Sequence, residues 1–321
     1  MQYCSLFLKR LLENTLVVSI YKNRAEVQYF NPPDMPYFCG NLICMDMKFW
    51  KYQGAGNDFV MLDQRQKRWI SRSDTAYIEK LCDRRFGIGG DGLILLQNLE
   101  GYDFEMVYFN SDGRESSMCG NGGRCIAAFA RDMGIITGTC RFMAIDGEHE
   151  ATVSATSIRG EAWVELKMLD VQKVVIRDNS YILNTGSPHY VRFEHQVEGM
   201  DMMAEGRAVR YSDAFRKDGV NVNIVCIDPA KTQENGLLIR TYERGVEAET
   251  FACGTGVTAA AIATYFEQKY TPGTYEIPVT AKGGALSVRF KAQANGTFTD
   301  IWLCGPAAFV FEGSITVDNA A

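Results

Sequence analysis

Polar and apolar positions alternate over much of the chain, and short apolar runs are bounded by turn residues, which predicts many short strands. Helix-forming stretches are few and short. Strands are expected at 47–52, 59–63, 93–96, 104–109, 139–146, 150–158, 161–168, 171–177, 221–225, 237–241, 275–281, 285–290, 299–303 and 307–312, with a strand–turn–strand unit at 181–191 and helical stretches at 73–84, 119–131, 196–216 and 253–269. Strands that alternate with two short central helices indicate an α+β fold in which sheet surrounds each helix.

One arrangement of residues occurs twice. An Ala-rich, helix-forming run follows Cys119-Gly120, and another follows Cys253-Gly254. Each cysteine has a tyrosine eleven residues before it and a glutamate four residues before it: Tyr108 and Glu115 in the first copy, Tyr242 and Glu249 in the second. Self-similarity at one large spacing predicts two related halves, each of which contributes one cysteine.

A thiol at a helix N-terminus faces free backbone N–H donors and the positive end of the helix dipole, and both lower its pKa. Two such cysteines across a cleft form a base and an acid that can invert a carbon centre. The facing helix starts would stabilise a carboxylate. Neither motif contains a lysine, so we expect no pyridoxal cofactor. The alternative is plain packing, with each cysteine as a small apolar residue.

Composition narrows the class of protein. The chain has 321 residues, which favours two domains, and its net charge of −6 gives no basic footprint for nucleic acid. No apolar run is long enough for a membrane-spanning helix. The ten cysteines form no Cys-x-x-Cys pair and the three histidines have no zinc spacing, so we expect no metal and a reducing, cytoplasmic compartment.

The first 46 residues differ in character from the rest. Lys9-Arg10 interrupts the apolar start, so no signal-peptide core forms, and Asn31-Pro32-Pro33-Asp34 is a break. Met47 begins the first regular strand and could be the true start. We expect residues 1–46 to be an appendage, with a genuine accessory segment as the alternative.

Other polar motifs are weak evidence for a function when each is taken alone, and each has a structural interpretation. The glycine-rich loop from Gly87 to Gly92 lacks a following Lys-Ser/Thr and opens onto a strand, so it predicts a turn that lets backbone approach a ligand rather than a phosphate loop. His189 could be structural, and Glu243-Arg244 could be a surface ion pair. Asn57, Asn110 and Asn221 could be turn residues that end strands.

From Met47 to about Gly313 the chain resembles the diaminopimelate epimerase family. The resemblance rests on Gly54-Ala-Gly-Asn-Asp-Phe59, Phe109-Asn-Ser-Asp-Gly113, Cys119-Gly-Asn-Gly-Gly-Arg124, Gly186-Ser-Pro-His189, Tyr242-Glu-Arg-Gly245 and Ala252-Cys-Gly-Thr-Gly256. It implies two pseudo-symmetric domains, each a curved sheet or barrel around a central helix, with the active site in the cleft. The implied domains are 47–165 and 166–305, and the last strand, about 306–321, returns to the first.

The resemblance also implies the reaction and the residues that perform it. The family interconverts LL- and meso-2,6-diaminopimelate without a cofactor, in lysine and peptidoglycan-precursor biosynthesis, and it implies a homodimer. Cys119 and Cys253 would be the base and acid pair. The substrate-binding positions would be Asn57, Asn110, Gly120, Asn121, Asn221, Glu243, Arg244, Gly254 and Thr255, and Ser187 and His189 are further candidates.

Two positions depart from the family pattern. The family usually has Asn where this chain has Ser187, and some members have Gln at Gly92. Two other functions stay open. One is another isomerase of the same fold, proline racemase-like or phenazine-biosynthesis-like. The other is a non-enzymatic thiol-binding or redox module.

Overall fold

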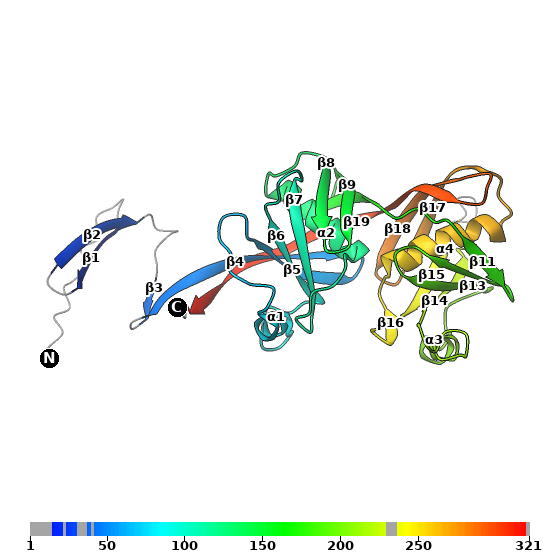
Figure 1. The fold of residues 1–321 in the computed structure, drawn as a ribbon, viewed down its shortest axis with the longest axis horizontal. Helices are drawn as coiled ribbons and strands as arrows, with labels where there is room; N and C mark the ends of the chain where they lie inside the picture. The colour runs from blue at the N-terminus through cyan, green and yellow to red at the C-terminus, as the bar shows by residue number, and fades with distance from the viewer. Residues whose placement is uncertain (1–14, 22–23, 31–36, 40–41, 229–235, 319–321) are drawn as a thin grey trace. The chain divides into compact units, whose positions relative to one another are not determined.

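The computed structural model describes residues 15–21, 24–30, 37–39, 42–228 and 236–318. The chain divides into two compact units, Met1–Lys48 with Gly313–Ala321, and Phe49–Glu312. Figure 1 shows a strand-rich α+β chain with few helices, as the sequence predicts.

The helices are α1 (Thr75–Cys82), α2 (Gly120–Asp132), α3 (Met202–Arg210) and α4 (Gly254–Glu267) in the part of the chain that the structure describes. Most strands follow the predicted ones within a few residues. They are β1 (Thr15–Tyr21), β2 (Arg24–Phe30), β3 (Tyr37–Cys39), β4 (Leu42–Gly54), β5 (Asn57–Asp63), β6 (Gly92–Gln97), β7 (Phe104–Asn110), β8 (Thr139–Ala144), β9 (Gly147–Ala155), β10 (Glu161–Lys167), β11 (Val174–Arg177), β12 (Ser180–Asn184), β13 (Pro188–Phe193), β14 (Asn221–Ile227), β15 (Leu237–Glu243), β16 (Ala248–Thr250), β17 (Gly273–Ala281), β18 (Gly284–Ala292) and β19 (Phe298–Asp318).

The smaller unit contains strands within the residues that were predicted to be an appendage. β1 and β2 form an antiparallel hairpin, and β3 pairs with the first residues of β4. β4 therefore begins at Leu42, before the predicted start at Met47. The predicted domain boundaries stay a prediction.

The larger unit contains the same succession of strands twice. In the first half β4 and β5 are antiparallel, β5 and β6 are parallel with α1 between them, and β6 and β7 are antiparallel. In the second half β12 and β13, β13 and β14 with α3 between them, and β14 and β15 repeat those directions. The repeat continues beyond each cysteine, since β7–β8 and β15–β17 are both parallel. The duplicated cysteine motif thus lies within a duplicated fold.

A central helix fills each half (Figure 1). α2 packs against β5, β6, β9 and β10, and α4 packs against β12–β15, β17 and β18. Most residues of both helices are buried on every side. The small side chains of the Ala259–Ala263 run let strands approach α4 closely, which is why an Ala-rich sequence forms a central helix here.

Two expectations about element length were wrong. The helix expected over 196–216 is restricted to α3, which begins after Asp201, whose side chain caps it by accepting from Met203 and Ala204 N–H. The two strands expected at 299–303 and 307–312 are one strand, β19. Gly305-Pro306 looks like a break in sequence, yet Pro306 pairs in register with Trp163 of β10. β19 also pairs with β18, so it joins the two halves.

Candidate active site

Each of the duplicated cysteines is the N-cap of a central helix, as predicted. Cys119 precedes α2 and Cys253 precedes α4, and both have extended backbone angles. In both copies the residues before the cysteine pair back with the preceding strand. Glu115 bridges to Phe109, whereas Glu249 pairs with Tyr242, so the two registers differ by one residue.

The repeated glutamates anchor these segments through arginines. Glu115 forms an ion pair of 2.8 Å with Arg72, and Glu249 binds Arg240 through both carboxylate oxygens at 2.7 and 3.0 Å. The glutamates thus hold the approach to each cysteine.

The two helix starts meet. A β-carbon added to Gly120 would lie 3.5 Å from the Cα of Gly254. Asn121, in the first turn of α2, donates a hydrogen bond of 2.9 Å to the carbonyl of Ala252, directly before Cys253. The two predicted catalytic cysteines are therefore brought to one place from the two halves.

Burial has the largest effect on the pKa of both thiols. It raises the pKa of Cys119, although the backbone N–H groups of Gly122 and Asn121 act to lower it. Burial and the negative charge of Glu243 raise the pKa of Cys253 to about 12, against the lowering effects of the Thr255 hydroxyl and the Gly256 N–H. The helix-start effect is present as expected, but the expected net lowering was wrong, because desolvation disfavours the charged thiolate more strongly.

The two cysteines share electrostatic neighbours. The charge of Glu243 acts on both thiols, and a charge on Cys119 acts on Cys253. Burial likewise raises the pKa of Glu243 and of Tyr108, and negative charge on Cys119 raises that of Tyr108 further. Negative charge on Glu243 therefore makes ionisation of either thiol harder, and negative charge on Cys119 does the same for Cys253 and Tyr108.

Arg124 is a fully buried cation beside this site, with 0% exposure. It donates to the Asn121 side-chain oxygen at 2.9 Å and to the carbonyls of Gly120 and Pro306 at 3.4 Å. Its charge lowers the pKa of Cys119. Arg124 ends the first cysteine motif in the sequence, where no role was predicted for it. The structure shows that it is a positively charged neighbour of the Cys119 thiol.

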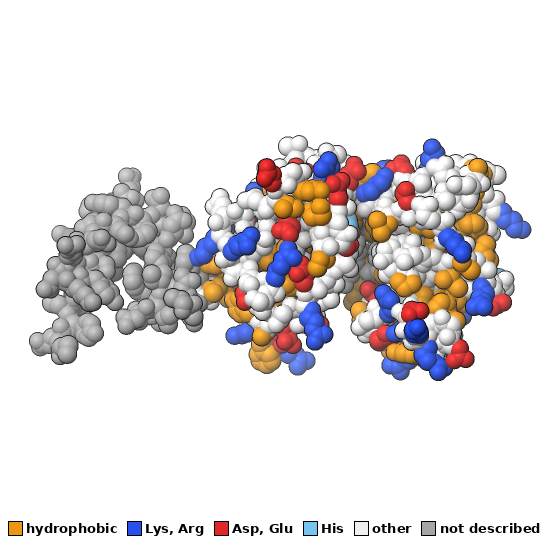
Figure 2. Space-filling model, in the orientation of Figure 1, with side chains coloured by type: hydrophobic (Ala, Val, Ile, Leu, Met, Phe, Trp, Pro, Cys, Tyr) orange, Lys and Arg blue, Asp and Glu red, His pale blue; other side chains and the backbone are white. Residues whose placement is uncertain are grey.

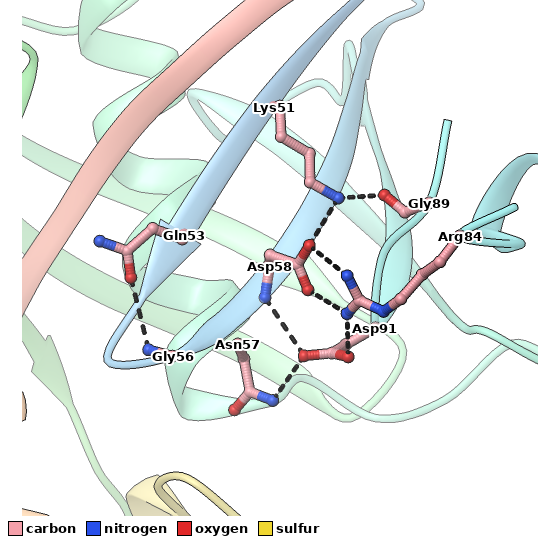
Figure 3. A network of polar contacts seen from close by, with 8 residues as sticks. All are labelled: Lys51, Gln53, Gly56, Asn57, Asp58, Arg84, Gly89 and Asp91. Atoms are coloured by element: carbon pink, nitrogen blue, oxygen red, sulfur yellow. Dashed lines mark hydrogen bonds and ion pairs between the residues drawn. The ribbon is translucent and has the colours of Figure 1, made fainter. Parts of the chain in front are cut away.

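A polar network positions Asn57, as Figure 3 shows. Asp91 accepts from the Asn57 side chain at 2.8 Å, and Asp91 and Asp58 both bind Arg84. Asp58 also forms an ion pair of 2.8 Å with the buried ammonium of Lys51, which donates to the Gly89 carbonyl as well.

This network connects to the helix starts. The Asn57 side-chain oxygen accepts from Asn121 at 2.5 Å. Its amide therefore has a fixed orientation, with the oxygen toward α2. The glycine-rich loop contributes to the site through Gly89 and Asp91 rather than through phosphate binding.

The polar residues of the second half form another cluster. The Asn221 side chain donates to Ser187 at 3.0 Å and to the Pro188 carbonyl at 3.1 Å, and accepts from the Arg244 N–H at 2.8 Å. His189 is fully buried, with a pKa lowered to about 3 by burial and then by the charge of Arg244. The structure thus brings Ser187, His189, Asn221 and Thr255 together, since Ser187 also lies 3.2 Å from the Thr255 hydroxyl.

Asn110 and Arg244 are more exposed than the rest of the predicted set. The backbone of Asn110 closes a turn with Gly113 and Arg114, so the turn reading of this residue also holds. The guanidinium of Arg244 donates to the Asp218 carbonyl at 2.9 Å. Arg244 is thus exposed to solvent while one of its guanidinium nitrogens is bound within the protein.

Neighbouring residues explain why position 92 is a glycine in this chain. A β-carbon there would lie 2.6 Å from the ring of Tyr108 and would collide with the Phe109 carbonyl. The Tyr108 ring occupies the space that a side chain at this position would need.

No cluster of potential metal ligands and no helix that could cross a membrane occurs among the described residues. A hollow of about 530 Å³ lies in the second half between Val197–Met200, β15 and β17, and the cysteines do not line it. On the face shown in Figure 2, acidic and basic side chains are interspersed rather than gathered in one basic stripe.

The comparisons with known proteins first define the class. The fold is a two-halved one that solved structures share. It matches a phenazine biosynthesis protein of the PhzF family from Bacillus anthracis, with a TM-score of 0.65, 14% identity, and coverage of 85% of this chain and 100% of that one. It also matches a hydroxyproline epimerase from Agrobacterium vitis, with a TM-score of 0.60, 12% identity, and coverage of 86% and 94%. At these identities the likeness concerns the fold alone, and it confirms the predicted two pseudo-symmetric domains.

The family follows from sequence. The family model for diaminopimelate epimerase matches residues 49–172 and 181–310. A diaminopimelate epimerase from Flavobacterium psychrophilum is 50% identical over 269 residues, which cover 84% of this chain and 100% of the relative. The chain belongs to the diaminopimelate epimerase family. The predicted resemblance is confirmed, and the chain is an epimerase rather than a thiol redox module.

Proposed function

We propose that this chain interconverts LL- and meso-2,6-diaminopimelate without a cofactor, with Cys119 and Cys253 as the acid and base pair. The observation that carries the proposal is the meeting of two cysteine-capped helix starts from two related halves. A racemising site needs one group on each face of the carbon, and duplication with pseudo-symmetry supplies two equivalent groups. Family membership supports diaminopimelate as the substrate.

The reaction balances with one proton and no redox change. A thiolate at one cysteine takes the α-proton, and the electron pair is left on the α-carbon and delocalised into the carboxylate. The thiol of the other cysteine then donates its proton to the opposite face, so the first cysteine ends as a thiol and the second as a thiolate. Product release and proton exchange with water reset the pair.

The site's electrostatics support such a cycle. The negative neighbours of the thiols disfavour two thiolates together, so a thiol and a thiolate can coexist. The α-ammonium group of an amino acid brings a positive charge near the sulfur, which offsets the desolvation of the thiolate. The helix-start amides at Gly120, Asn121, Gly254 and Thr255 would hold the reacting carboxylate and its developing charge.

Arg244, with Asn110 and Asn221, would bind the end of the substrate that does not react, and Arg244 would bind its carboxylate as a planar fork. Asn57 and Glu243 would be further substrate-binding residues. Ser187 accepts a hydrogen bond from Asn221, so it would affect the substrate indirectly, through Asn221.

The setting of the enzyme is part of the same proposal. We expect a cytoplasmic homodimer that serves lysine and peptidoglycan-precursor biosynthesis, with domains at 47–165 and 166–305, residues 306–321 returning to the first domain, and residues 1–46 as an extension. Light scattering of the purified protein tests the dimer: a mass of one chain would contradict it.

The reaction itself is tested in heavy water. Purified protein with reductant and no added cofactor is incubated with LL-diaminopimelate. The stereoisomers are separated by chiral chromatography, and their masses are measured by mass spectrometry. We expect the meso isomer with one deuterium at the inverted α-carbon. Recovery of undeuterated LL substrate, or dependence on added pyridoxal phosphate, would overturn the proposal.

A further inference from the structure

A chain of hydrogen bonds leads from a buried histidine to the sulfur of Cys253. Asn223 Nδ2 lies 3.1 Å from His189 Nδ1, and His189 Nε2 lies 3.0 Å from Ser187 Oγ. Ser187 Oγ lies 3.2 Å from Thr255 Oγ1, which lies 3.4 Å from Cys253 Sγ. The Asn223 amide nitrogen can only donate, and the surrounding groups favour one direction for the contacts that follow it.

The direction begins at Asn223, whose amide orientation is fixed. Its Nδ2 donates to the Tyr190 carbonyl at 3.1 Å, and its Oδ1 accepts from the Thr241 hydroxyl at 3.0 Å. The second hydrogen on Nδ2 therefore points to His189 Nδ1, which must accept it. A neutral imidazole that accepts at Nδ1 has its proton on Nε2.

The neutrality of His189 follows from its surroundings. The side chain is 0% exposed, and the charged group that acts on it is the cation Arg244. Both effects disfavour a second proton. His189 Nε2–H therefore donates to Ser187 Oγ.

Ser187 is the point where the direction is enforced. Its oxygen also receives a hydrogen bond from Asn221, whose orientation the Pro188 carbonyl and the Arg244 N–H fix on either side. With two donors on its two lone pairs, Ser187 must use its own hydroxyl hydrogen as a donor. The acceptor within reach is Thr255 Oγ1.

Because Thr255 Oγ1 accepts from Ser187, its own hydrogen is available to donate to Cys253 Sγ, 3.4 Å away. We propose that Ser187, held by His189 and Asn221, is a positioning residue that fixes the Thr255 hydroxyl as a donor to the Cys253 sulfur and so stabilises the Cys253 thiolate. This role rests on the proposed function, in which that thiolate is a base. Thr185, which donates to the Thr255 carbonyl at 2.8 Å, keeps Thr255 in place.

Among the residues that the structure describes, no matching hydroxyl chain leads to Cys119 in the first half. The described contacts to its sulfur are backbone N–H groups from Asn121 and Gly122, with the charges of Arg124 and Glu243 acting on it. The groups that act on Cys253 are Glu243 on β15, Cys119 at the start of α2, the Thr255 hydroxyl and the Gly256 N–H. The hydroxyl chain is therefore a difference between the two thiols within a pseudo-symmetric site.

The test measures the Cys253 thiol directly and uses no substrate. In a Cys119→Ala background, the rate of alkylation by iodoacetamide is followed against pH, and mass spectrometry quantifies the peptide that contains Cys253. We expect Thr255→Val to raise the apparent pKa of Cys253 by about 1 unit, since it removes a hydrogen bond to the charged form. Ser187→Ala is expected to raise it by roughly half a unit, because Thr255 loses its enforced direction.

The matched controls keep each hydroxyl. Thr255→Ser and Ser187→Thr are expected to shift the apparent pKa by less than about 0.3 units. Equal values in Ser187→Ala and Ser187→Thr would overturn the positioning role. Because diaminopimelate is absent, loss of the expected shift and failure of the proposed reaction are separate outcomes.

A second measurement examines His189, near the beginning of the hydrogen-bond chain, in the wild-type protein. Nitrogen-15 NMR identifies the protonated ring nitrogen of His189, assigned with a His189→Gln variant. We expect a neutral ring with its proton on Nε2 throughout about pH 5 to 8. A ring protonated on Nδ1, or one that gains charge in this range, would overturn the proposed direction.

Discussion

Gly254 and Gly120 touch across the two halves of the chain: a β-carbon added to Gly254 would lie 3.3 Å from the Cα of Gly120 and 2.8 Å from a methyl group of Leu303. The contact sets how closely the two central helices approach, and each helix begins at a predicted catalytic cysteine. Glycine is needed at this place for its missing side chain, because the space is already filled.

Gly254→Ala is therefore expected to separate the helix starts and to lower kcat/KM by roughly 10- to 100-fold, since small displacements of catalytic groups are costly. Leu303→Val, which removes a contacting methyl group, is expected to restore part of the loss in the double variant. The measurement is steady-state epimerisation in all three variants. If Gly254→Ala keeps full activity, this contact does not set the thiol geometry.

Removal of either thiol should stop epimerisation. Cys119→Ala and Cys253→Ala are each expected to lose at least about 10³-fold in kcat, within the range for loss of a general acid or base. A Cys→Ser variant should keep only a trace, because a hydroxyl is a far weaker base. Cys226→Ala, which removes another buried free thiol, is the control. Circular dichroism checks folding, and near-full turnover by either single alanine variant would rule out the two-base mechanism.

The sequence predicted the parts of the site that depend on local pattern. Helix starts at Cys119 and Cys253 followed from small residues before an Ala-rich run, and two halves followed from the repeated spacing. The strands around them had clear alternation. The long strand β19 was missed because Gly305-Pro306 is a local break signal, whereas pairing with β10 and β18 on both sides overrides it.

The remaining features depend on tertiary contacts that spacing does not contain. The direction of the thiol pKa shifts was wrong, because burial is a property of the packed site and not of the helix start. Asn223, which orients His189, stood in the sequence as one of several polar residues in an apolar strand. Its role required knowing that β13 and β14 are parallel neighbours, with Val191 opposite Asn223.

Buried thiols should also make the fold sensitive to alkali. Burial raises the pKa of Cys125 from an ordinary value of 9.0 to about 12. Above pH 9 the unfolded thiol loses its proton while the folded thiol retains it, so stability is full below pH 9 and falls as pH rises toward 12. This group alone should cost about 1 kcal/mol between pH 9 and 10.

Urea unfolding of wild type and Cys125→Ala at these two pH values measures that contribution. We expect the free-energy difference between the two proteins to shrink by about 1 kcal/mol from pH 9 to 10. Ile126→Val, a neighbouring buried change without a titrating group, should show a difference that does not depend on pH. A pH-independent difference for Cys125→Ala as well would mean that the buried thiol ionises as readily as an unfolded one.

The last prediction concerns the choice of substrate. Arg244 is exposed, with its backbone N–H bound to Asn221 and its guanidinium bound to the Asp218 carbonyl. A planar fork suits a carboxylate better than a point charge does. L-Lysine lacks the distal carboxylate of LL-diaminopimelate, and a site built to pair with a polar group rejects analogues without it by about 10⁴- to 10⁵-fold. We expect kcat/KM for L-lysine to fall below that for LL-diaminopimelate by such a factor. Arg244→Lys should lose most of the activity toward LL-diaminopimelate and change the rate with L-lysine little, since that rate never used the fork. Comparable kcat/KM values for the two substrates in the wild type would refute the distal-carboxylate role of Arg244 and indicate a broader amino acid racemase.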